Sequence, residues 1–177
     1  MRRLRSWCAY TGVCVGLVLC IGCSPVPLSK GTSKRLPTSE MSLLVWGHEP
    51  SLVNTVILWL NSRSIPVIEP SVVREHIGKF GESEAVWVDE TTVLRAARAM
   101  HATQVAFVTR IGDYRAPAVF VRGVDASSGE VVWTGTSRYP KYASDPAPHT
   151  LALLTCRALE AAWQLGGSVH DICATTN

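Results

Sequence analysis

The stretch MSLLVWGHEPSLVNTVILWLNSRSIPVIE, residues 41–69, has the pattern of a strand, a helix and a second strand. The apolar run 41–46 predicts a buried strand, and Pro50 suits the first turn of a helix. The helix expected over 51–62 carries a wide apolar face, so it must pack against a sheet. Residues 65–69 predict a second strand, which a right-handed crossover places parallel to the first. The proline near the start of that strand indicates an edge position or a bulge.

Two further helices are expected after this unit. Residues 70–77 predict a short helix, and 78–88 a loop with an extended patch at 84–88. Asp89 is followed by an acidic residue and two threonines. This order is typical of an N-cap and predicts a helix through His101.

The C-terminal half predicts an antiparallel meander. Its three β-rich runs are joined by short connections, and Gly129 suits the left-handed position that ends a hairpin turn. A last helix is expected over 149–165, stopped by two glycines. The runs are 103–111 (TQVAFVTRI), 118–125 (AVFVRGVD) and 130–139 (EVVWTGTSRY).

The sequence therefore predicts one α/β (α+β) domain over residues 41–166, followed by a C-terminal tail over 167–177. We expect the order β-α-β-α-α-β-β-β-α, with a mixed sheet in a three-layer-like arrangement. The sheet should combine an N-terminal parallel crossover with a C-terminal antiparallel meander.

Residues 1–22 have the pattern of a lipoprotein signal peptide. Arginines precede an apolar segment, and Ile21-Gly22-Cys23 resembles the bacterial lipobox, although Cys20 stands where that motif usually has leucine. The resemblance implies that Cys23 receives a diacylglycerol and becomes the first mature residue. A membrane-spanning helix is disfavoured, because the apolar run 7–22 falls short of the roughly 20 residues that a span needs.

The signal peptide changes the charge of the chain. The full sequence has 17 Lys and Arg against 14 Asp and Glu, and residues 1–22 hold three arginines and no acidic residue. The mature chain is therefore formally neutral, at 14 against 14, which argues against nucleic acid as a partner.

Ser24 is not the aspartate that resembles an inner-membrane retention signal. We expect an outer-membrane location, facing the periplasm and lipid-anchored.

Residues 23–40 are interpreted as the lipidated cysteine and a flexible tether, because serine and proline dominate and apolar residues are scattered. A tether of this length holds the domain near its membrane.

Cys156 and Cys173 remain after the signal cysteines and Cys23 are accounted for. In an oxidising compartment they form either a disulfide or two free thiols.

His48 and Glu49 directly follow the first strand, where open α/β sheets bind ligands. The residue four positions after His48 is Leu52, so the zinc motif His-Glu-x-x-His is not formed. A loop that caps the first helix is favoured over catalysis. The sequence contains no phosphate loop, Rossmann fingerprint, nucleophile elbow or Cys-x-x-Cys pair, so we expect no enzyme, cofactor or metal.

Residues with binding chemistry are expected in two loops. Asp113, Tyr114 and Arg115 lie between two predicted strands, where exposed charge is usual and a binding edge is an alternative. Trp87 lies in the predicted loop before the third helix. It is interpreted either as a partner contact or as a flap packed on the sheet.

Several stretches together resemble the bacterial envelope lipoproteins related to the curli secretion channel and the penicillin-binding-protein activator. The resemblance spans about residues 41–165, and its most specific part is the hairpin VDASSGEVVW at 124–133. The other parts are the lipidated N-terminus, LLVWG at 43–47 with Glu49-Pro50, IPVIE at 65–69 and ATQV at 102–105.

The resemblance implies a small α/β domain without enzymatic activity that works through contacts with other envelope proteins. The first hypothesis is a non-enzymatic accessory or assembly factor. Alternatives are a subunit of an oligomeric curli-type secretion apparatus, which would make the chain a homo-oligomer, and an envelope enzyme using His48 and Glu49.

Overall fold

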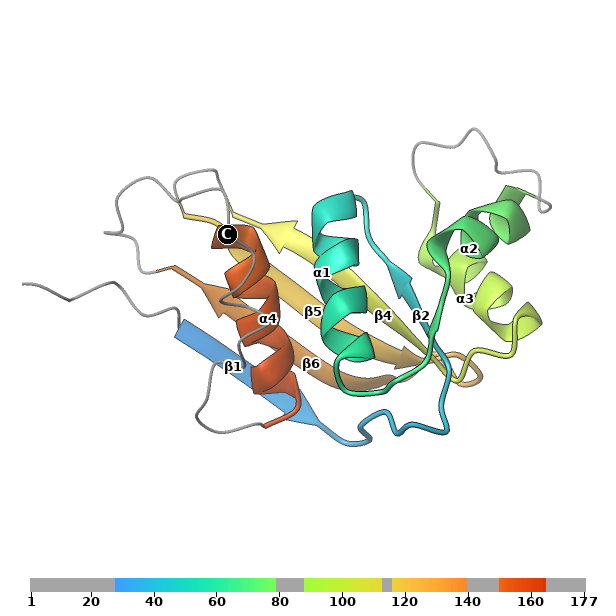
Figure 1. Ribbon diagram of the computed structural model, residues 1–177, viewed down its shortest axis with the longest axis horizontal. Coiled ribbons are helices and arrows are strands. Elements are labelled where there is room, and N and C mark those ends of the chain that lie inside the picture. The colour runs from blue at the N-terminus through green and yellow to red at the C-terminus, as the bar shows by residue number, and fades with distance from the viewer. Residues whose placement is uncertain (1–27, 79–87, 113–115, 140–149, 165–177) are drawn as a thin grey trace, which may run out of the picture.

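The computed structural model describes residues 28–78, 88–112, 116–139 and 150–164. A mixed sheet lies between two pairs of helices, with α1 and α4 on one face and α2 and α3 on the other (Figure 1). The predicted fold class and element order are confirmed, with one additional strand before the first predicted one. The elements are β1 (Leu28–Ser33), β2 (Leu43–Trp46), α1 (Pro50–Asn61), β3 (Val67–Ile68), α2 (Pro70–Ile77), α3 (Glu90–Ala99), β4 (Gln104–Ile111), β5 (Ala118–Asp125), β6 (Val131–Arg138) and α4 (Thr150–Ala162).

In the described part of the chain, the sheet has six strands in the order β1-β6-β5-β4-β2-β3. β2 pairs parallel with both β3 and β4, whereas β4, β5 and β6 pair antiparallel in sequence. The predicted crossover and the predicted meander are therefore both present. β3 has two residues and lies at the edge of the sheet, as the neighbouring Pro66 indicated.

Local sequence signals set the element ends. Pro50 and Pro70 occupy the first turns of α1 and α2, where a missing backbone N–H costs no helical hydrogen bond. Asp89 caps α3, because its Oδ1 accepts a hydrogen bond from the Thr92 backbone N–H at 2.6 Å. Gly129 ends the β5–β6 turn with a φ of 75°, the left-handed conformation predicted for it.

One face of the sheet, here called the covered face, packs against α1 and α4. The indole rings of Trp59 and Trp133 both contact that of Trp163, with centroids 5.0 Å and 4.6 Å away. The Trp133 Nε1 donates a hydrogen bond to the Gln104 Oε1 at 2.9 Å, and both side chains are buried. The polar edge of a large aromatic ring is thus satisfied inside the core.

Two glycines let α4 lie directly on the strands of the covered face. A Cβ at Gly31 in β1 would lie 2.2 Å from the Ala161 carbonyl oxygen, and one at Gly135 in β6 would lie 1.9 Å from the Ala158 carbonyl oxygen. These distances are far below van der Waals contact. Any side chain at either position must displace the backbone of the helix or of the strand.

The other face carries a smaller core beneath α2 and α3. Buried side chains of both helices pack there against β2, β4 and the end of β5, and among the described residues this core takes no member from β1 or β6. The helices therefore cover only part of this face. The core residues include Leu44, Val73, Ile77, Val93, Val105, Phe107 and Val124.

The prediction of a flexible tether over residues 23–40 is wrong from Leu28 onward. Residues 28–33 form β1, which pairs antiparallel with β6. The backbone N–H of Lys34 then donates to the Val132 carbonyl at 2.7 Å, and Leu36 packs against the covered-face core. Ser29, Gly31 and Ser33 lie on the side of β1 that approaches α4, so β1 has few apolar residues and its composition resembles that of a linker.

Within residues 28–78, 88–112, 116–139 and 150–164, no helix is long and apolar enough to cross a bilayer.

Candidate functional site

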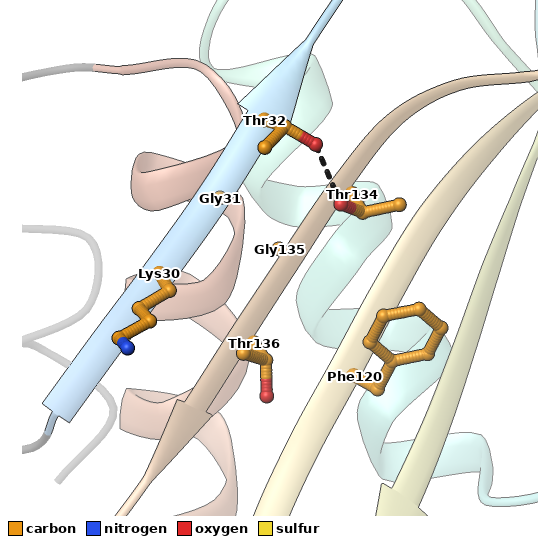
Figure 2. Close-up of a pocket in the computed structure, with 7 residues that line it drawn as sticks. All are labelled: Lys30, Gly31, Thr32, Phe120, Thr134, Gly135 and Thr136. Atoms are coloured by element: carbon orange, nitrogen blue, oxygen red, sulfur yellow. Dashed lines mark hydrogen bonds between the residues drawn. The ribbon is translucent and has the colours of Figure 1, made fainter.

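The strands β5, β6 and β1 expose a polar surface on the side away from α4. Alternation places Phe120, Thr134, Thr136, Lys30 and Thr32 on this side, and the sheet register sets Phe120 and Lys30 on either side of Thr136. Figure 2 shows these side chains in front of the strands, with α4 behind them. We call this surface the open face.

The open face is hollowed. The depression has a volume of about 420 Å³ and is lined by the open-face side chains and by the backbone at Gly31 and Gly135. The hydroxyls of Thr32 and Thr134 lie 3.0 Å apart across the β1–β6 pair and are hydrogen-bonded.

The chemistry of the open face suits a polar partner. Three hydroxyls can donate and accept hydrogen bonds, the Lys30 ammonium adds a positive charge, and the Phe120 ring supplies an apolar contact. Among the described residues, no acidic side chain lines the depression. The arrangement can hold carboxylate or amide groups of a partner, but it offers no nucleophile paired with a base.

A second, smaller pocket lies at the carboxyl ends of β2 and β4. Its volume is about 170 Å³, and His48 is among its lining residues, as the position after the first strand predicts. The Arg122 guanidinium forms an ion pair with Glu90 there and lies 4.9 Å from the centre of the Phe107 ring. Because the carboxylate of Glu90 neutralises the guanidinium of Arg122, this pair adds no net charge to the pocket. The remaining lining residues are Trp46, Gly47, Val88, Val108 and Thr109.

His48 and Glu49 are not brought to one pocket. Glu49 is the residue before α1 and does not line the pocket that contains His48. Its backbone is extended, with φ of −97° and ψ of 112°, and its side chain makes no capping hydrogen bond. In the described part of the chain, no group of three or more His, Cys, Asp or Glu residues could hold a metal ion.

Cys156 is buried in α4, with an exposed fraction of 2%, and takes part in a disulfide. Its predicted partner Cys173 lies outside the described residues, so the pairing stays a prediction. The lipidation site Cys23 and the expected contact residues Trp87, Asp113, Tyr114 and Arg115 also lie outside them.

Sequence reasoning missed the open face. The sequence predicted β5 and β6 but not β1, and it predicted no role for the threonines. The signal was the alternation of Thr134 and Thr136 with Gly135, which predicts a polar side and a close-packed side of one strand. Without β1 there was no second strand to show that this polar side continues.

Comparison with known proteins locates the fold. A scan against protein-family models found no match, and a search of curated proteins found none. Among solved structures, the C-terminal domain of LpoB from Salmonella enterica matches with a TM-score of 0.52 and 15% identity, over 60% of this chain and 86% of that one. The same domain from Escherichia coli gives a TM-score of 0.48 at 16% identity, over 55% and 81% of the two chains. Lipoprotein GNA1162 from Neisseria meningitidis gives 0.49 at 15%, over 72% and 99%.

The Salmonella structure shows that the chain shares its fold with an LpoB C-terminal domain. At this identity the likeness extends to the fold alone.

Proposed function

We propose that this chain is a lipid-anchored lipoprotein of the bacterial envelope that acts as an accessory or assembly factor through protein contacts and performs no chemistry. The signal peptide and Cys23 support attachment to the outer membrane on its periplasmic side. The fold shared with the LpoB domain is consistent with this proposal.

The open face is the observation that carries the proposal. A depression of about 420 Å³ lies on β1, β6 and the part of β5 around Phe120, and among the described residues the core beneath α2 and α3 reaches only the other end of β5. It is broad and lined by hydroxyls, a cation and one aromatic ring, the kind of mixed surface that a protein partner can bury. A buried catalytic site would instead enclose its reacting groups.

Photo-cross-linking in intact cells tests the proposal. A benzophenone amino acid replaces Phe120 on the open face, and a matched variant carries it at Leu58, an exposed residue of α1 on the other side of the sheet. We expect adducts to another envelope protein from position 120 and none from position 58. Equal adducts from both positions, or none from position 120, would contradict the proposal.

The same experiment separates the oligomer alternative. Adducts between two copies of this chain, together with a large mass in detergent, would favour a subunit of an oligomeric secretion apparatus. Loss of fatty-acid labelling and of membrane association in Cys23→Ala checks the anchor independently.

A further inference from the structure

The end of the sheet nearest the lipid anchor has an unusual row of side chains. The register aligns Leu28 of β1 with Arg138 of β6, Arg138 with Ala118 of β5, and Ala118 with Ile111 of β4. These residues form the last row of the open face, beyond the threonines. Three strand spacings of about 4.8 Å make the row roughly 14 Å wide.

The row exposes large apolar side chains. Leu28 is 55% exposed and Ile111 is 45% exposed, and they flank the exposed Arg138. Lys30 lies one row inward on the same face. Apolar side chains accompanied by cations, with no acidic residue in the row, are the composition that binds a lipid surface carrying phosphate groups.

The length of chain before β1 brings this row to the membrane. Five residue steps separate Cys23 from Leu28, and a fully extended chain covers at most about 18 Å in that distance. An acylated Cys23 lies in the bilayer surface, so β1 must begin close to that surface. The neighbouring ends of β6, β5 and β4 lie beside the start of β1, because the four strands are neighbours in one hydrogen-bonded sheet (Figure 1).

We propose that this row, formed by Leu28, Arg138, Ala118 and Ile111, rests on the leaflet that holds the acyl chains of Cys23. Leu28 and Ile111 contact lipid, while Arg138 and Lys30 face the headgroup phosphates. The inference rests on the proposed lipidation and adds an orientation to it. In this orientation the strands extend away from the membrane surface. The threonines of the open face then lie beyond the membrane-facing row, where a partner in the periplasm can contact them.

Site-specific labelling of the acylated, full mature chain tests this orientation. A fluorescent label is attached to a cysteine at position 28 or 111, and the protein is placed in vesicles containing phosphatidylglycerol and a lipid that carries a quencher. Positions 58 and 72 are matched controls, because Leu58 is 56% exposed and Val72 is 45% exposed on other elements. A chain without an introduced cysteine gives the background.

We expect quenching at positions 28 and 111 and none above background at 58 and 72. Equal quenching at all four positions, or none at 28 and 111, overturns the orientation. Mass spectrometry of the same sample reports whether Cys23 is acylated, so a failure of the anchor is distinguishable from a failure of the orientation. An unacylated Cys23 removes the premise of both.

A charge variant provides a second readout. In a Cys23→Ser chain, which has no acyl group, Arg138→Ser should weaken binding to phosphatidylglycerol vesicles about fivefold. Arg74→Ser on α2 removes an exposed arginine elsewhere and should leave binding unchanged. Equal effects of the two substitutions would contradict a defined membrane-facing row.

Discussion

One face of the sheet is covered by α1 and α4 from β2 to β1, whereas the other is covered by α2 and α3 only as far as β4 and the end of β5. On the covered face, tryptophans and glycines meet helix backbone. On the open face, the same strands carry threonines and a lysine. Alternation along a strand thus gives the two sides of β6 different compositions: one side packs in the core against α4, and the other carries the polar residues of the proposed contact surface.

The largest expected difference between the faces is at neighbouring residues of β6. Gly135→Ala introduces a Cβ 1.9 Å from the Ala158 carbonyl oxygen, and we expect the free energy of unfolding to fall by about 3 kcal/mol. Thr136→Val on the open face should change it by less than about 0.5 kcal/mol. Urea unfolding followed by tryptophan fluorescence measures both. Similar changes in the free energy of unfolding for the two variants would contradict the described difference between the faces.

Buried and exposed polar pairs provide the next comparison. Gln104→Leu leaves the buried Trp133 indole N–H without its acceptor, and we expect a loss of about 2 kcal/mol in the free energy of unfolding. Thr134→Val removes the exposed hydroxyl pair with Thr32 and should cost less than about 0.5 kcal/mol. The double variant Gln104→Leu with Trp133→Phe removes both polar partners. It should cost less than the sum of the single variants, and strict additivity would rule out the coupling.

A smaller, pH-dependent effect is expected at the β5–β6 turn. The pKa of Asp125 is lowered, first by the hydrogen bond from the Ser127 side chain and then by that from the Ser128 backbone N–H. A lowered pKa in the folded state stabilises the protein above the unfolded value of about 3.9, and this contribution is lost as the pH falls through the folded pKa. Asp125→Asn should therefore destabilise the protein at pH 6 and reduce the loss of stability between pH 5 and pH 3. An unchanged acid slope in urea titrations would contradict this assignment.

The elements that the sequence predicted correctly are those marked by residues close to their own ends. The helices at Pro50, Pro70 and Asp89 were predictable because each starts with a residue whose local chemistry favours a helix N-terminus. The meander was predictable from alternation and from Gly129. Such signals act over a few residues, so a single chain shows them directly.

The missing parts depend on contacts between distant residues. β1 is a strand because it pairs with β6, and Gly31 lets it lie close to α4 about 130 residues away; a segment of serine and glycine gives no local sign of either contact. The open face likewise depends on how far α2 and α3 extend over the sheet, which only tertiary packing decides. The lipidation site, the pairing of Cys156 and the loop contacts at Trp87 and at 113–115 remain predictions.

The role of the open face as a contact surface is tested most directly by one variant pair in cells. Thr136→Glu places a carboxylate in the open face, and Asn54→Glu places one on the exposed side of α1. Each is combined with the benzophenone residue at position 120, and the yield of partner adduct is measured beside the urea midpoint of the purified protein. We predict that Thr136→Glu loses the adduct while its midpoint stays that of Asn54→Glu. An adduct yield equal to that of Asn54→Glu would contradict a partner bound at the open face.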